Sequence, residues 1–221
     1  MRAPVTNLKE RLTAPNDSLA SIMPSAITLA MMLRQRSMAT WLRAEFQGYG
    51  DDAALPPHRL HIKGEIMVES PQYGWIPAPL NAAQKRGYDG VDIAEGIQAL
   101  EKTCSNNRRG GSIQIAMPPA QVAALRARLN QGAELTMTVH RDQFNVLLRS
   151  VRGAIYLWVR ELIDQGMGGP RNAFNPEERA ATAHLDTPEQ FIQRAMAEGA
   201  ALPVPGAQVA GILDRLFRRA R

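Results

Sequence analysis

The 221-residue chain has a single cysteine, Cys104, and no long apolar run. One cysteine excludes an intrachain disulfide and is typical of proteins from a reducing compartment. Residues 1–7 lack the apolar core of a secretion signal. The most apolar stretch, residues 22–33, contains Pro24 and is followed by Arg34, and it is too short to span a bilayer. We therefore expect a cytoplasmic protein.

Signatures of nucleotide, metal and cofactor chemistry are also missing from the sequence. It contains neither the phosphate-binding loop with its terminal lysine nor the dinucleotide-binding glycine pattern. No carboxylate or thiol lies at ligand spacing from His58 and His61, and the other two histidines are His140 and His184. We interpret all four as ordinary surface or loop histidines, and we expect no bound metal and no cofactor.

Cys104 is the one candidate nucleophile with a basic setting. Lys102, Arg108 and Arg109 are its neighbours in sequence, and positive charge favours a reactive thiolate. No sequence argument brings a histidine to it, however. We interpret it as a small, partly buried structural residue.

Three carboxylates give a second catalytic hint. Glu45, Asp51 and Asp52 lie close together around a predicted turn, as the acids of some metal-dependent nucleases do. No further acid and lysine follow in a nuclease-like order. Solvation at a helix end and in a loop is the preferred interpretation, so an enzyme is the less favoured reading of the chain.

Apolar residues make up 45% of the chain, enough to build a core. Lys and Arg number 26 against 21 for Asp and Glu, and the pI is about 9.8. This mild excess indicates a weak preference for acidic partners such as nucleic acid. The candidate nucleic-acid or phosphate contacts are basic residues of the 105–112 loop and the C-terminus: Arg108, Arg109, Arg215, Arg218 and Arg219.

Helical spacing dominates the first fifty residues. Asn16–Ser18 offers capping side chains for a helix through Leu33, in which Pro24 fits only within the first turn. Ser37 is expected to cap a second helix, which Gly48 ends. Two antiparallel helices joined by a tight turn are the simplest reading.

The middle of the chain alternates strands and helices. Period-two patterns predict strands at 60–68, 113–117 and 135–139, with a short strand at 75–76. Asp92 and Glu95 resemble a capping box for a helix that carries Ile97 and Leu100, and Pro118–Pro119 opens another helix. The strongest helical stripe then follows in a helix that Gly166 ends: Phe144, Leu148, Val151, Ile155, Trp158 and Leu162.

A glycine-rich segment at 166–170 suggests a domain boundary. We therefore divide the chain into a domain at 1–167 and a linker with a C-terminal helical tail at 168–221. In the tail, Thr187–Gln190 is predicted to be a capped helix start, with proline at the first helical position. A last helix carries an apolar stripe that could cover its own domain, a partner subunit or a membrane surface: Val209, Ile212, Leu213, Leu216 and Phe217. Its own domain or a sister chain is the default. The predicted fold is α+β, mainly helical with a small antiparallel sheet and a C-terminal helical appendage.

Two separated stretches carry a family resemblance. The first begins with the helical segment Ser18–Ala30, continues from Trp41 through Glu45 and Gly48 to Tyr49, and closes with a proline-rich turn that ends in Arg59. Much later, a Val-Arg pair that contains Arg152 begins a helical run. Together these stretches resemble the AbiTii domain of bacterial abortive-infection proteins over about residues 7–167. Phe46 replaces the usual leucine and His58 the usual tyrosine.

The resemblance implies a role in defence against bacteriophage, but it supplies no active site. We interpret the six matching residues as structural, with Glu45 paired to Arg59 or Arg152. The preferred hypothesis is a non-enzymatic module that self-assembles or docks on a partner protein of a defence system. A nucleic-acid-binding protein and a toxin-like nuclease, with Glu45 or Asp51 in its site, are the alternatives.

Overall fold

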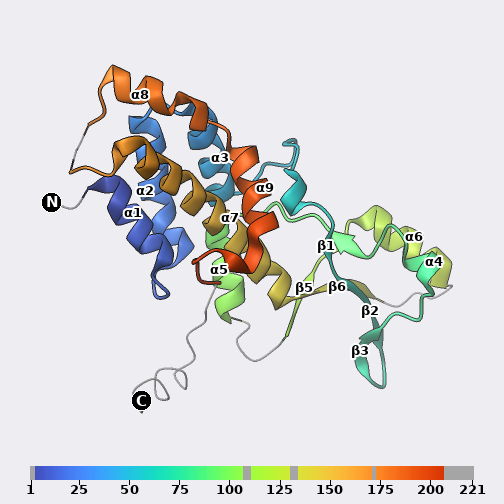
Figure 1. Ribbon diagram of the computed structural model, residues 1–221. Coiled ribbons are helices and arrows are strands. Elements are labelled where there is room, and N and C mark those ends of the chain that lie inside the picture. The colour runs from blue at the N-terminus through green and yellow to red at the C-terminus, as the bar shows by residue number, and fades with distance from the viewer. Residues whose placement is uncertain (1–2, 107–110, 130–133, 171–172, 207–221) are drawn as a thin grey trace, which may run out of the picture. The chain divides into compact units, whose positions relative to one another are not determined.

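The computed structural model describes residues 3–106, 111–129, 134–170 and 173–206 (Figure 1). Its contacts divide the chain into two compact units. Unit 1 comprises Met1–Asp51, Glu95–Asn106 and Asn145–Arg221, and unit 2 comprises Asp52–Ala94 and Asn107–Phe144. The fold is α+β, mainly helical with a small antiparallel sheet, as predicted.

Unit 1 is helical. Its elements are α1 (Pro4–Thr13), α2 (Leu19–Met32), α3 (Arg36–Gln47), α5 (Ile97–Asn106), most of α7 (Arg141–Leu162), the π-turn η2 (Ile163–Met167), α8 (Pro176–Thr182), η3 (Ala183–Leu185), α9 (Pro188–Glu198) and η4 (Gly199–Ala201). The last four follow the glycine-rich segment at which we predicted a boundary. The position of a domain boundary there stays a prediction.

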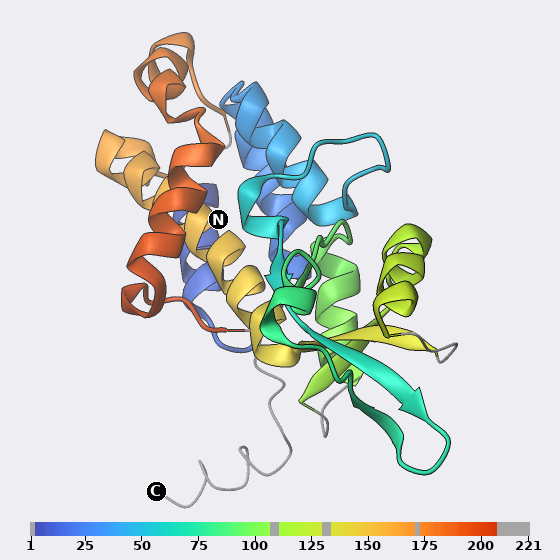
Figure 2. The ribbon, with the colours of Figure 1, turned by 90° about the vertical axis from the view of Figure 1, so that its right-hand side faces the viewer.

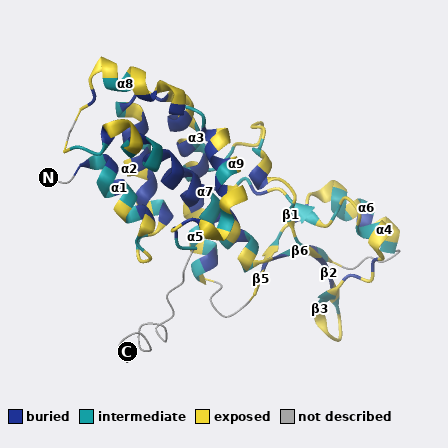
Figure 3. Cartoon of the chain, viewed as in Figure 1, coloured by how far each residue is buried: buried dark blue, intermediate teal, exposed yellow. Residues whose placement is uncertain are grey.

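The core of unit 1 gathers around α7. All six residues of its predicted apolar stripe are buried, which confirms the stripe. From Val151 to Val159 every side chain is buried, so α7 is covered on all sides over this stretch. Figure 3 shows the same concentration of buried residues in α2, α3 and α7.

A close helix crossing lies at Gly153 of α7. A Cβ atom there would lie 2.8 Å from Leu202 Cδ1 and 3.2 Å from Ala195 Cβ. Glycine at this position therefore lets α9 and the chain after it approach the α7 backbone. Figure 2 shows α9 running beside α7.

The beginnings of α2 and α3 differ in part from the prediction. Ser18 does cap α2, since its hydroxyl accepts a hydrogen bond from Ser21 N at 3.2 Å. Pro24, however, lies inside α2 and beyond its first turn, because the helix already begins at Leu19. Ser37 does not cap α3 either. Arg34 turns the chain with φ of 60°, and α3 starts at Arg36 with Gln35 as its N-cap.

Unit 2 holds a four-stranded antiparallel sheet in the order β3-β2-β6-β5. Its strands are β2 (Glu65–Ser70), β3 (Gly74–Pro77), β5 (Ser112–Ile115) and β6 (Leu135–His140). A two-stranded ladder pairs β1 (Ile62–Lys63) with β4 (Gly90–Val91), and η1 (Pro57–Arg59), α4 (Ala82–Lys85) and α6 (Pro119–Leu129) complete the unit. These strands confirm the period-two patterns.

The first predicted strand is broken at Gly64. Its N–H donates to Asp89 O at 3.0 Å, whereas the next residue, Glu65, pairs with Thr138 of β6. The chain therefore changes partner at Gly64 and forms two strands instead of one. Leu60, expected on the buried face, is 43% exposed, because it precedes the first strand.

Two predicted helix caps are also wrong. Asp92 does not open α5, which begins at Ile97; its Oδ1 instead accepts a hydrogen bond from His61 N at 2.8 Å. Thr187 precedes α9 as predicted and Pro188 takes the first position, but the threonine side chain makes no capping bond to the helix backbone.

In the part of the chain that the structure describes, no helix is both long and apolar enough to cross a membrane.

Candidate functional site

Arg152 holds the C-terminal end of α1. Its Nε donates to Leu12 O at 2.7 Å, and its Nη2 donates to Arg11 O at 2.9 Å and Ala14 O at 2.8 Å. Nη1 donates to Asp17 O at 2.8 Å. The last carbonyls of a helix have no intrahelical donor and carry partial negative charge, so a guanidinium satisfies them well. Arg152 thus bonds to the main chain and not to Glu45.

Burial and the neighbouring carboxylates shift the pKa of Arg152 in opposite directions. Burial lowers the pKa of its guanidinium from the ordinary value, and the carboxylates of Glu101 and Asp17 counter part of that shift, while Arg11 adds to it. The side chain is 4% exposed. An arginine stays charged at neutral pH even so, and the four carbonyls supply the polar surroundings that a buried cation requires.

Two carboxylates hold helix beginnings in unit 1. Glu101 of α5 accepts from Leu19 N at 2.7 Å and Ala20 N at 3.0 Å at the start of α2. Asp186 accepts from Ser37 N at 3.1 Å and Met38 N at 2.7 Å at the start of α3. The negative charge of both carboxylates matches the partial positive charge of a helix N-terminus, just as the positive charge of Arg152 matches the C-terminal end of α1.

The other residues of the family motif lie on α3, directly after it, and in η1. Glu45 is fully buried and accepts a hydrogen bond from the Tyr49 hydroxyl at 2.7 Å. Gly48 ends α3 with φ of 100°, as predicted. Arg59 is buried in unit 2, where its Nη1 donates to Ile93 O at 3.1 Å. The remaining member, Trp41, is half-buried on α3.

The structure separates the predicted acids by their exposure. Glu45 is buried, whereas Asp51 and Asp52 are exposed in the loop after α3. Cys104 is 1% exposed, which is deeper than expected. Among the described residues no group of three or more His, Cys, Asp or Glu side chains is arranged to hold a metal ion.

The histidines divide into two classes. His61, His140 and His184 are exposed, as predicted. His58 is 6% exposed and is therefore not a surface histidine; it lies in the short turn η1 beside the buried Arg59. The basic contacts Arg108, Arg109, Arg215, Arg218 and Arg219 lie outside the described residues, and so do Val209, Ile212, Leu213, Leu216 and Phe217 of the predicted interaction stripe.

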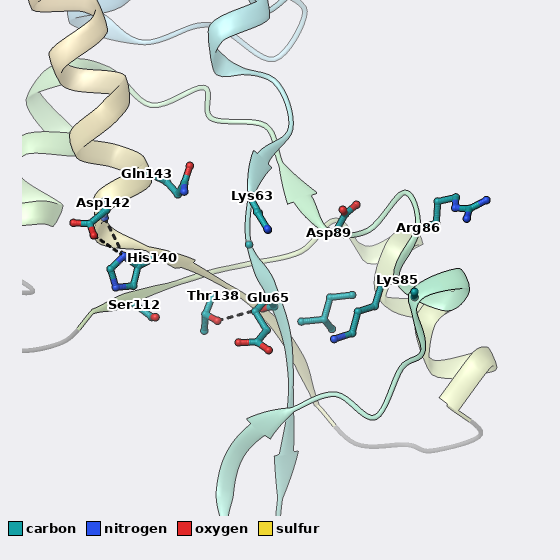
Figure 4. Close-up of a pocket in the computed structure, with 13 residues that line it drawn as sticks. Lys63, Glu65, Lys85, Arg86, Asp89, Ser112, Thr138, His140, Asp142 and Gln143 are labelled. Carbon is teal, nitrogen blue, oxygen red and sulfur yellow. Dashed lines mark hydrogen bonds and ion pairs between the residues drawn. The ribbon is translucent and has the colours of Figure 1, made fainter. Parts of the chain in front are cut away.

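Sequence reasoning missed a trough in unit 2 with a volume of about 820 Å³ (Figure 4). It lies on the polar face of the sheet, where cross-strand partners place Glu65 beside Thr138 and Ser112 beside His140. The polar and charged lining residues are Lys63, Glu65, Lys85, Arg86, Asp89, Ser112, Thr138, His140, Asp142 and Gln143. The period-two pattern from residue 60 to residue 68 puts Lys63 and Glu65 on the face opposite Ile66, but only the strand pairing brings the lining residues together.

His140 ends β6 at the point where α7 begins. Its Nδ1 lies 3.3 Å from the main-chain N of Asp142 and 3.2 Å from Oδ2 of the same residue. The neutral ring accepts the hydrogen bond from that N–H at the start of the helix, and the protonated ring pairs with the carboxylate. Ser, His and Asp therefore meet here in a hydrolase-like set of residue types, but His140 and Asp142 serve the helix end and are both exposed.

A known protein family matches most of the chain. A family model described as AbiTii matches residues 5–187. This confirms the resemblance found in the sequence and carries it beyond residue 167, into the region of η3. The chain matches no curated protein and no solved structure.

Proposed function

The chain belongs to the AbiTii family of abortive-infection proteins, which act in defence against bacteriophage, and we propose that it serves there as a non-enzymatic interaction and assembly module. One observation carries this proposal. The charged family residue Arg152 donates hydrogen bonds to four main-chain carbonyls, three at the end of α1 and that of Asp17 shortly before α2. A charged side chain whose hydrogen bonds go to the main chain stabilises the fold. Glu45 is used in a similar way, because it is buried and accepts a hydrogen bond from the Tyr49 hydroxyl.

The C-terminal segment supplies the interaction surface in this proposal. Arg149 of α7 donates to Ala200 O and Leu202 O, both at 3.2 Å, and Leu202 and Val204 are buried. The chain is therefore attached to unit 1 up to this point. The apolar stripe from Val209 to Phe217 follows directly in the sequence, and its helical spacing suits a sister chain or a partner helix.

The test is the mass of the purified protein in solution, measured by light scattering, for the full chain and for a chain that ends at Gly206. The cut must follow Val204, because an earlier one would remove a buried side chain. We expect the full chain to have a multiple of 24.3 kDa and the shortened chain a lower mass with an unchanged circular dichroism spectrum. Equal association by both chains would overturn this role for the stripe.

A point variant separates the stripe from the length of the segment. Leu213→Asp places a charge within the stripe, whereas Ala207→Asp places the same charge outside its spacing. The first should lower the mass and the second should not. Equal effects of the two substitutions would count against a specific apolar interface.

A further inference from the structure

Two lysines line the trough in unit 2 and make no ion pair within the part of the chain that the structure describes. Asp89 pairs with His61 at 3.4 Å, and Asp142 pairs with His140 at 3.2 Å. Within the described residues, no carboxylate lies within ion-pairing distance of Lys63 or Lys85. Two ammonium groups therefore stand in the hollow without an ion-pair partner among these residues, while the formal charges of the whole lining balance, with Lys63, Lys85 and Arg86 against Glu65, Asp89 and Asp142.

The two lysines come from different elements and share one space. Lys63 from β1 and Lys85 from α4 both extend into the hollow, whereas the guanidinium of Arg86 is directed away from β2 (Figure 4). A compact ammonium group binds phosphate oxygens as a point charge. Two of them reaching a single hollow from separate elements match an anion with several oxygens.

The rest of the lining is suited to a polar group beside that anion. Ser112 and Gln143 offer donors and acceptors, and Glu65 offers an acceptor for hydroxyl or amine hydrogens. The Thr138 hydroxyl donates to Glu65 O at 3.2 Å and fixes the sheet at this point. The volume of about 820 Å³ falls within the range of about 300–1,000 Å³ typical of small-molecule sites.

We infer that this trough binds a nucleotide, with its phosphates on Lys63 and Lys85 and its sugar or base edge on Glu65 and its polar neighbours. The site lies wholly within unit 2 and is independent of the assembly role proposed for the C-terminal segment. Two kinds of ligand carry a phosphate next to a sugar and a base: a free nucleotide, and one nucleotide unit of a single-stranded nucleic acid. Single strands are held by stacking on aromatic rings along a basic track, and the described lining holds no Phe, Tyr or Trp, which favours the free nucleotide.

The test is isothermal titration of the full chain with each of the four ribonucleoside triphosphates, with inorganic triphosphate and with a strand of about ten deoxythymidines. The variants are Lys63→Gln and Lys85→Gln, and Arg86→Gln is the matched control because it removes the same charge from a side chain directed away. We expect saturable binding of a nucleoside triphosphate that weakens about tenfold or more in either lysine variant, the loss of one charge-assisted contact. The control should stay within about twofold, since it changes only a screened long-range charge.

The other outcomes are distinct. Binding of the strand alone, with the same dependence on the two lysines and a steep loss from about 50 to about 200 mM salt, supports the site and assigns the polymer as its source. Equally tight binding of inorganic triphosphate overturns the nucleoside part of the inference. Absence of binding by every probe overturns the site, and so does an equal effect of Arg86→Gln. Because Lys63 and Arg86 are exposed and Lys85 is half-buried, thermal melting should show all three variants folded.

Discussion

Trp158 donates a hydrogen bond from its indole Nε1 to Oε1 of Gln35 at 2.8 Å, and both side chains are buried. The amide of Gln35 is used on its other side as well, since Nε2 donates to Thr182 O at 2.7 Å. One glutamine therefore joins three separated parts of unit 1: the start of α3, the middle of α7 and the end of α8. Both hydrogen bonds of this bridge are buried.

Replacing Gln35 by leucine keeps an apolar side chain of similar size but removes both hydrogen bonds. The indole N–H and the Thr182 carbonyl would be left without these partners, and a buried unsatisfied polar group costs about 1–3 kcal/mol. We expect the free energy of unfolding to fall by about 2–4 kcal/mol, measured by urea denaturation. Gln165→Leu is the control because Gln165 is exposed; a comparable loss in both variants would contradict the role of the bridge.

Replacing Arg152 by lysine should destabilise unit 1 although the charge is kept. A lysine ammonium group cannot spread its donors over four carbonyls as the planar guanidinium does. We expect a loss of about 2–4 kcal/mol in the free energy of unfolding. Arg160→Lys, on the same helix but with a side chain 37% exposed, should change it by less than about 0.5 kcal/mol. If the two variants melt alike, the hydrogen bonds of Arg152 contribute little to stability.

Replacing Asp186 by alanine removes the acceptor for the first N–H groups of α3. Loss of a helix cap costs about 0.5–2 kcal/mol, and here the cap also ties η3 to α3. Asp186→Asn keeps one side-chain oxygen and should retain part of the stability. Thermal unfolding followed by circular dichroism should give melting temperatures that fall from the wild type to Asp186→Asn to Asp186→Ala. An alanine variant as stable as the wild type would show that this cap contributes little to stability.

Replacing Gly96 by alanine tests a contact between backbones. A Cβ atom there would lie 2.4 Å from Phe46 O and 2.7 Å from Gly48 N. Main-chain atoms cannot move aside as a side-chain tip can, so we expect a loss of about 3 kcal/mol or more, or failure to fold. Gly50→Ala is the control because nothing lies within 4 Å of the added atom. Normal expression and melting of the Gly96 variant would show that α3 and α5 can separate at this point.

Local patterns predicted much of the fold. The apolar stripe of α7 follows from a strict three-and-four spacing, and the strands follow from alternation, because both depend only on neighbours along the chain. Ser18 and Gly48 are helix signals of the same kind. The prediction that Pro24 lies in the first turn of its helix was wrong, because α2 begins five residues before it, at Leu19. A helix can hold a proline beyond its first turn when tertiary packing stabilises the helix.

The remaining features depend on contacts between distant residues. Asp186 caps a helix 149 residues earlier in the chain, and no pattern near Ser37 reports it. Arg152 is marked by the family motif, but its four carbonyl acceptors follow only from the packing of α1 on α7. The trough likewise arises where β1, β2, α4, β5 and β6 meet, and single-chain periodicity does not predict which strands become neighbours.

The division into units also sets an order for synthesis on the ribosome. Every residue of unit 2 is translated by Phe144, whereas unit 1 still lacks the rest of α7 at that moment. α1, α2 and α3 must wait for Trp158 and Arg152, whose partners Gln35 and Leu12 lie 123 and 140 residues earlier in the chain. Contacts of such separation close slowly. Unit 2 therefore has the first opportunity to fold on the nascent chain, while the N-terminal helices remain dependent on the last third of the protein.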